Sequence, residues 1–185
     1  RGADKAGKGL AVKEDNMLDQ VFGELDFDDC GYWNGRVKLD WFGEEREVGL
    51  MVDSCYESQT EISHHQREAY LAFLEKWPEL QEAVVQEIIR YYNEEERFAY
   101  GPDDPEEFAA WWPEIETVEE MVKWVELETV VVASDSIMEN VYDGKRCLYL
   151  LFNRKWAEED LNDNGVGLRL LNEEIDGARF KDIAF

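Results

Sequence analysis

The middle of the chain contains two stretches in which hydrophobic residues recur at helical spacing. The first starts at Ser63, which forms a capping-box pattern with Gln66. Its hydrophobic positions are Tyr70, Leu71, Phe73, Leu74 and Trp77. Those of the second stretch are Leu80, Val84, Val85, Ile88, Ile89 and Tyr92. Pro78 lies between them, and because a proline disfavours a helical residue before it, the pattern predicts two helices that form an αα-hairpin.

Strands are predicted on both sides of these helices, from alternating hydrophobic and polar residues before them and from β-branched and hydrophobic runs after them. The N-terminal hydrophobic positions are Phe22, Leu25, Phe27, Trp33, Val37, Leu39, Trp41, Val48, Leu50 and Val52. Turn residues separate three strands there, so we expect an antiparallel meander with one covered face. Segments 127–133 and 147–153 predict two further strands, and segments 166–171 and 178–185 predict a closing hairpin. The predicted fold class is α+β, with antiparallel strands at both ends and the helices between them.

The pattern predicts one domain preceded by a short extension. Residues 1–16 carry three glycines, three alanines and a small positive charge, and we expect them to be a flexible extension outside the fold. Residues 17–185 hold all the patterned segments, and no repeat or low-complexity linker divides them. We therefore expect a single α+β domain over residues 17–185.

The formal net charge of −25 arises from 44 Asp and Glu residues against 19 Lys and Arg residues. Such a charge repels nucleic acid and anionic membranes, and nucleic-acid binding requires clustered Lys and Arg. The acidity fits an acidic surface that binds a basic protein partner. It equally fits general solubility or adaptation to high salt. We expect no nucleic-acid partner, and both explanations of the acidity stay open.

Hydropathy and cysteine usage bear on the compartment. No stretch reaches the ~18 hydrophobic residues of a membrane-spanning helix, and no signal-peptide pattern opens the sequence. The three cysteines, at positions 30, 55 and 147, are widely spaced and form no C-x-x-C pair. This spacing fits reduced thiols better than a disulfide framework or a zinc site. We expect a cytoplasmic protein without a membrane partner.

One segment matches the front half of a calcium-binding loop, with oxygen ligands at Asp160, Asn162 and Asn164 followed by Gly165. The twelfth position of such a loop requires a bidentate Glu, and here it is Leu171. We therefore expect an ordinary Asx-rich turn, with a weak Ca²⁺ site as the alternative. No other cofactor is expected.

No catalytic residue is nominated by the sequence. His64 and His65 are adjacent at a helix start and point in different directions, so they make a poor metal site. Neighbouring carboxylates are expected by chance among 44 acidic residues and do not identify an acid–base pair. The sequence lacks a Gly-rich phosphate loop, a nucleophile elbow and an H-E-x-x-H motif.

Seven tryptophans occur in the chain, and most follow the strand or helix periodicity of core residues. Trp111 and Trp112 are the exception, because adjacent residues of one element rarely both face inward. We expect one of the two to be exposed and available to a partner.

The C-terminal part also contains a recognisable group of residues. These are Trp156-Ala-Glu-Glu159-Asp160, Gly165-Val-Gly167 and the closing Asp182-Ile-Ala-Phe185. They resemble the W-x-x-E-x-G-x-G and D-x-A signature of an uncharacterised bacterial family of domains of unknown function. Gln66, Ala69, Phe73, Leu74 and Tyr91-Tyr92 extend the resemblance over most of residues 20–185. The chain departs from the signature by inserting residues 161–164 and by carrying Asp160 where members often have His.

The resemblance implies no established activity, and small acidic members of the family resemble immunity or accessory proteins. The leading hypothesis is a non-enzymatic, acidic interaction protein, such as an immunity-type protein that binds a basic toxin or nuclease. The alternative is a small enzyme or ligand-binding protein with a pocket near Trp156, Glu159 and Asp160.

Overall fold

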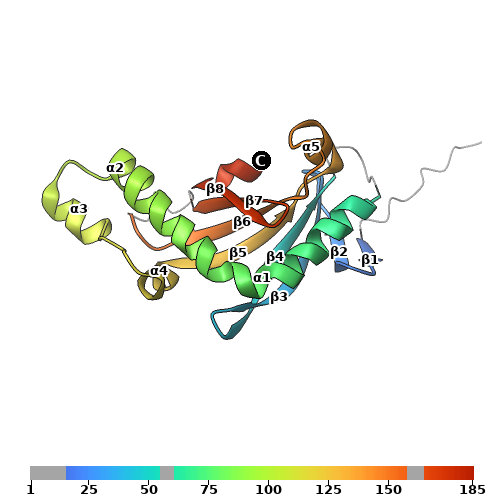
Figure 1. Cartoon of the computed structure of the whole chain (residues 1–185), viewed down its shortest axis with the longest axis horizontal. Helices are drawn as coiled ribbons and strands as arrows, with labels where there is room; N and C mark the ends of the chain where they lie inside the picture. Colours follow the sequence, from blue (N-terminus) through green and yellow to red (C-terminus); the bar gives the residue numbers. More distant parts are fainter. Residues whose placement is uncertain (1–15, 55–60, 158–164) are drawn as a thin grey trace, which may run out of the picture.

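The computed structural model describes residues 16–54, 61–157 and 165–185, and within them eight strands form one sheet whose spatial order follows the sequence (Figure 1). Neighbouring strands are antiparallel, except that β4 and β5 are parallel. The strands are β1 Asn16–Asp19, β2 Gly23–Phe27, β3 Tyr32–Trp41, β4 Glu44–Asp53, β5 Val125–Val132, β6 Cys147–Arg154, β7 Val166–Leu171 and β8 Glu174–Phe180. The predicted α+β class, with antiparallel strands in both terminal parts, is confirmed.

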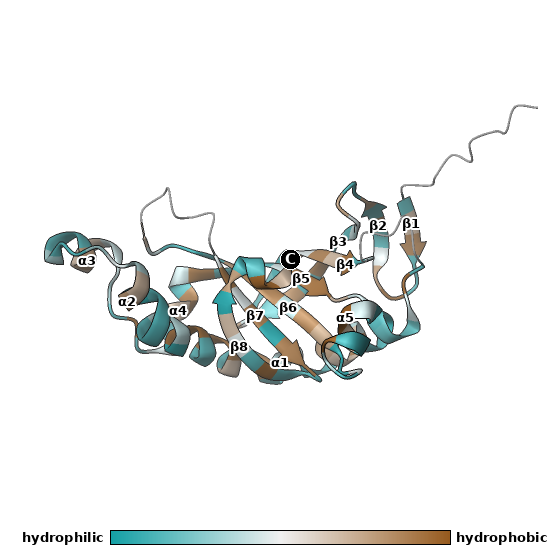
Figure 2. Ribbon diagram, turned by 90° about the horizontal axis from the view of Figure 1, so that it is seen from above, coloured by the Kyte–Doolittle hydropathy of each residue, from teal (hydrophilic) through white to brown (hydrophobic). Residues whose placement is uncertain are grey.

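The connection from β4 to β5 contains most of the helices. A tight turn cannot join two parallel neighbours, so the chain crosses over one face of the sheet. The crossover consists of α1 His64–Tyr91, the π-helix η1 Tyr92–Glu96, α2 Arg97–Tyr100, α3 Pro105–Trp111 and α4 Val118–Trp124. Helix α1 runs along the sheet, whereas α2 and α3 lie beyond its end (Figures 1 and 2). Later in the chain, the described residues form two short helices, α5 Asp135–Asn140 and the 3-10 helix η3 Lys181–Ala184.

The predicted αα-hairpin is wrong, because α1 is one helix with Pro78 inside it. Contacts on both sides of the proline hold the helix against the same part of the sheet. The indole of Trp77 donates to the Asp40 carbonyl at 2.7 Å, and the Gln81 side chain accepts from the Phe42 N–H at 2.7 Å. These contacts outweigh the missing hydrogen bond of Pro78, and the helix curves over the sheet instead of ending (Figure 1).

The hydrophobic core lies between α1 and the sheet. The register places Leu50, Val130, Leu150, Leu168 and Ala178 in one row across five strands, and all five are buried. Burial of each large hydrophobic side chain in this row contributes about 1.5–3 kcal/mol. The middle of the sheet is correspondingly hydrophobic along β5, β6 and β7 (Figure 2). The buried residues of this row therefore lie on the face of the sheet that α1 covers.

The end of the chain differs from the predicted strand over residues 178–185. Strand β8 ends at Phe180, and η3 then turns back onto β7 and β6. This packing requires a small residue in β7, because a Cβ atom on Gly167 would lie 2.5 Å from the Cγ2 atom of Ile183. The hydrophobic residues of segment 178–185 are therefore compatible with a short helix as well as with a strand. The close approach of Ile183 to Gly167 favours the short helix η3.

The proline in α1 provides a stability test. Replacing Pro78, which is exposed, by alanine restores a backbone hydrogen bond without changing the packed side chains. We expect P78A to raise the free energy of unfolding, measured by urea denaturation, by about 2 kcal/mol. Alanine also gives the unfolded chain more conformational entropy than proline does, and this reduces the increase. A P78A variant less stable than the wild type would show instead that the core requires the curvature at the proline.

A buried carboxylate links the first strand to α1. The Asp19 side chain is 4% exposed and accepts from Arg67 Nη2 at 2.6 Å and from the backbone N–H groups of Val21 and Phe22. Burial alone would raise the pKa of Asp19, but the hydrogen bonds from Arg67 and the two backbone groups lower it below its usual 3.8. The ionised carboxylate therefore stabilises the folded chain.

This lowered pKa predicts a pH-dependent effect of Asp19→Asn. The contribution of the carboxylate is fully present above about pH 4 and is lost as the pH falls through the lower pKa of the folded state. We expect D19N to lower the free energy of unfolding by about 2 kcal/mol at neutral pH. The difference from the wild type should shrink below pH 3.8. A difference that stayed constant down to pH 2, or an equal loss in the exposed D26N control, would contradict this role.

Candidate functional site

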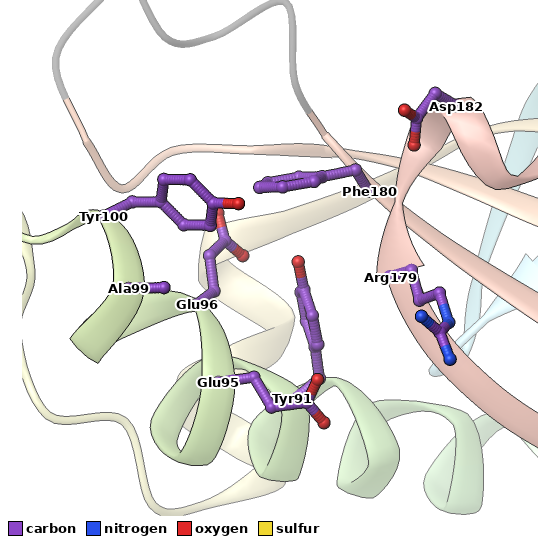
Figure 3. A pocket seen from close by; sticks show the side chains of 8 residues that line it. All are labelled: Tyr91, Glu95, Glu96, Ala99, Tyr100, Arg179, Phe180 and Asp182. Carbon is purple, nitrogen blue, oxygen red and sulfur yellow. The ribbon is translucent and has the colours of Figure 1, made fainter.

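A pocket of about 360 Å³ lies between the C-terminal end of the long helix and β8 (Figure 3). It is lined by Tyr91, Glu95, Glu96, Ala99, Tyr100, Arg179, Phe180 and Asp182. The helical side of the pocket comes from the end of α1, from η1 and from α2, and the other side comes from β8 and the start of η3. Its volume is at the lower end of the range for ligand pockets and suits a side chain or a small molecule.

The π-helix η1 sets the direction of the side chains on the helical side. A π-helical turn is wider than an α-helical turn, and it changes which face each following residue presents. In η1, Tyr92 and Glu96 are buried, whereas Glu94 and Glu95 between them are exposed. Short π-helical segments are rare and occur frequently at functional sites. The π-helix η1 therefore directs the carboxylate of Glu96, the last residue of the run Glu94-Glu95-Glu96, into the protein interior.

Glu96 forms a buried ion pair with Arg154 at the end of β6. The side chains are 1% and 2% exposed, and Arg154 Nη1 directly contacts Glu96 Oε1. The indole of Trp156 donates to the same oxygen at 3.2 Å. Charges removed from water are tolerated only when they are paired and hydrogen-bonded. The pair therefore fixes η1 against the end of β6.

Aromatic rings enclose this ion pair. The Tyr92 ring lies 4.6 Å from the Trp156 ring and 6.4 Å from the Trp112 ring, measured between centroids. The Arg154 guanidinium lies 5.8 Å from the centroids of both tryptophans. The Tyr92 hydroxyl donates to the Pro113 carbonyl at 2.6 Å. These rings exclude water from the pair on the side away from the pocket.

Two polar groups on the pocket wall have no partner within the described residues. Glu96 Oε2 is buried and accepts no hydrogen bond there. The Tyr91 hydroxyl, on a side chain that is also buried, makes none there either. Figure 3 shows the carboxylate of Glu96 and the hydroxyl of Tyr91 directed at the space beside Tyr100 and Phe180. Buried polar groups are normally hydrogen-bonded, so Oε2 of Glu96 marks a place for a ligand, and the Tyr91 hydroxyl lines the pocket beside it.

Burial determines the protonation of both groups. Burial raises the pKa of the Glu96 carboxyl, and the Arg154 charge and the Trp156 hydrogen bond act in the opposite direction. Burial, together with the Glu96 charge, raises the pKa of the Tyr91 hydroxyl, which therefore stays neutral at physiological pH. Perturbed groups in a cleft of this kind are typical of functional sites.

A family model described as a domain of unknown function, DUF6985, matches residues 21–185. The chain belongs to the DUF6985 family. No curated protein and no solved structure matches the chain. Membership of DUF6985 confirms the resemblance to a family of unknown function, while a bacterial origin and the C-terminal signature stay predictions.

The structure brings only some of the predicted residues of this DUF6985 chain to the site. Trp156 is fully buried and bonds to Glu96 behind the pocket. Trp111 is 44% exposed on α3, and its neighbour Trp112 is buried against Tyr92. The other predicted residues, Glu159, Asp160, Asn162 and Asn164, lie outside the described residues. The weak Ca²⁺ site therefore stays a prediction.

Sequence reasoning missed the ion pair, although one signal was present. Arg154 continues the inward-facing alternation of Leu148, Leu150 and Phe152 in β6, so a charged residue occupies a core position. A buried arginine requires a buried acid, which could have been sought. The acid itself, Glu96, stands third in the run Glu94-Glu95-Glu96, and only the π-helix distinguishes it from its neighbours.

The described part of this DUF6985 chain contains no group of three or more His, Cys, Asp and Glu residues that could hold a metal ion. In the same ranges, none of the helices has the length and hydrophobicity needed to cross a membrane.

The ion pair predicts a difference between two neighbouring glutamates. Glu96→Gln removes the buried carboxylate that Arg154 contacts, so we expect the free energy of unfolding to fall by roughly 3–5 kcal/mol. Glu94→Gln removes the charge of a side chain that is 66% exposed, and we expect a change within about 0.5 kcal/mol. Urea denaturation of both variants measures this difference.

A double variant separates the charge from the packing. Combining E96Q with Arg154→Met removes both charges of the pair and should recover most of the stability that E96Q loses, because neither charge of the pair is then buried without the other. If E96Q were no less stable than E94Q, the pair would not organise this end of the molecule.

Proposed function

We propose that this DUF6985 protein is a non-enzymatic interaction protein that binds a basic protein partner. An immunity-type protein that occludes a basic toxin or nuclease is one form of such a protein. The observation that carries the proposal is an acidic, aromatic arm beside the pocket, which we define as residues 97–112. The arm contains α2 and α3 and extends beyond the sheet (Figures 1 and 2).

The exposed aromatic side chains of the arm support this proposal. Phe98 is 73% exposed, Tyr100 is 54% exposed and Trp111 is 44% exposed. Three large exposed aromatic side chains in one short segment exceed what solubility requires, and aromatic residues are the usual anchors of protein interfaces. General solubility or adaptation to high salt would favour a charged arm without them.

The charge of the arm is almost entirely negative. Asp103, Asp104, Glu106 and Glu107 are exposed around its turn. Its cation, Arg97, is engaged internally, because it donates to the Trp112 carbonyl at 2.9 Å and lies 4.7 Å from the Phe108 ring centroid. Acidic groups around aromatic anchors steer a basic partner and fix its orientation.

The C-terminal end of the arm is held by hydrogen bonds to neighbouring segments, which favours binding with little loss of conformational entropy. Ala157 follows Trp156 with φ of 70° and donates its N–H to the Trp111 carbonyl at 2.9 Å. Just beyond the same end of the arm, Asn93 of η1 donates to the Ile115 carbonyl at 2.7 Å. Preorganised surfaces bind more tightly than surfaces that must be ordered on binding.

A second candidate function is a small enzyme or ligand-binding protein that uses the pocket in front of Trp156. The hydrogen bond from Trp156 to Glu96 favours it, because Glu96 lines that pocket. Glu159 and Asp160, which the sequence assigned to the same pocket, lie outside the described residues.

Two variants with equal net charge test the role of the arm. The first neutralises the arm by D103N, E106Q and E107Q, and the second neutralises three exposed residues of β2 and β4 by E24Q, D26N and E47Q. We expect the arm variant to bind an arginine- and aromatic-rich peptide about tenfold more weakly than the control variant, measured by fluorescence anisotropy.

A glutamate-rich peptide of the same length should not bind either protein. Equal weakening in the two variants would show that only the overall charge attracts the peptide, and it would contradict a binding surface on the arm.

A further inference from the structure

We propose that the pocket between η1 and β8 binds the guanidinium group of an arginine side chain. The identity of the partner that presents this arginine rests on the function proposed above, whereas the pocket itself is argued from its own groups. Those groups are an acceptor without a partner, a hydroxyl without a partner, three aromatic rings and a rim with excess negative charge.

The buried wall supplies the acceptors. Arg154 and Trp156 both engage Oε1 of Glu96, so Oε2 keeps its full capacity to accept hydrogen bonds. The Tyr91 hydroxyl beside it can accept a further bond. A guanidinium carries N–H donors in a planar fork and can reach two acceptors at once. An anionic ligand would place its charge against Glu96 and is disfavoured.

The aromatic wall favours a planar, weakly hydrated cation. The Tyr100 and Phe180 rings lie 5.0 Å apart at 63°, and the Tyr91 and Phe180 rings lie 6.5 Å apart at 85°. Rings in these orientations contact one another and present both a face and an edge to a group beside them in the pocket. A guanidinium stacks on aromatic faces and loses less hydration than an ammonium group on entering such a site.

The rim adds negative charge and one opposing group. Glu95 and Asp182 are exposed at the mouth of the pocket, and so is Arg179. Arg179 forms no ion pair with the described residues, and its guanidinium is directed away from Phe180 in Figure 3. Glu95 already pairs with Arg90 at 2.8 Å, so a cation in the pocket meets Asp182 as the rim carboxylate outside an ion pair of the described residues and is repelled by Arg179. Removing the Arg179 charge should strengthen binding.

Three probes with the same alkyl chain test the pocket in the full-length chain: butylguanidinium, butylammonium and the neutral, planar butylurea. Isothermal titration should show saturable binding of butylguanidinium, binding of butylammonium about fivefold or more weaker, and no binding of butylurea. Saturation by butylurea with equal affinity, or no saturation by butylguanidinium, would overturn the proposal.

Variants that keep the ion pair intact locate the site. Phe180→Leu should weaken butylguanidinium binding about fivefold, and Tyr91→Phe about threefold, because each removes one interaction with the cation. Arg179→Gln should strengthen it about twofold. Phe42→Leu makes the same aromatic substitution at an exposed turn outside the pocket and should leave the affinity unchanged. An equal loss in F42L and F180L would place the cation elsewhere.

The two proposals fail separately. If butylguanidinium does not bind, but the arginine-rich peptide still binds the arm variant more weakly than the control variant, the pocket proposal is overturned. The proposal of a basic protein partner is then retained. If butylguanidinium binds as described but the peptide does not distinguish the two variants, the pocket stands and the arm is not the surface that binds the partner.

Discussion

The ion pair between Glu96 and Arg154 is the interaction on which the rest of this end of the molecule depends. A carboxylate and a guanidinium withdrawn from water are stable only if each has the other and no solvent competes for them. The π-helix directs Glu96 inward, the alternation of β6 directs Arg154 to the same place, and the rings of Tyr92, Trp112 and Trp156 exclude water. The pocket lies beside this ion pair, and Glu96 forms part of its wall.

The sequence predicts elements better than it predicts their boundaries. The alternation over 33–52 correctly predicted strands, and so did the continuous hydrophobic run over 147–153, whose strand β6 is buried on both faces. The sequence predicts a helix boundary at Pro78 because helix propensity depends only on neighbouring residues. It does not include the contacts that Trp77 and Gln81 make with the sheet. The order of strands, including the parallel β4–β5 pair, depends on the long crossover and has no local signal.

The same distinction explains why the site was only partly predicted. Trp156 stood out through its place in a family signature, and its hydrogen bond to Glu96 places it behind the pocket wall. Glu96 did not stand out, since it is one acid among 44 and its burial arises from a single π-helical turn. In the function we propose, the overall negative charge attracts a basic partner from a distance, and the arm and pocket supply the short-range selectivity that charge alone lacks.

The central claim is that the Glu96 carboxylate receives a cation in the pocket. A ¹³C NMR titration of the glutamate carboxyl groups, with and without butylguanidinium, tests it most directly. A cation that binds the ionised form must lower the raised pKa of Glu96, so we predict a downward shift of that pKa when the cation is present. Identical titration curves of Glu96 with and without the cation would contradict the account.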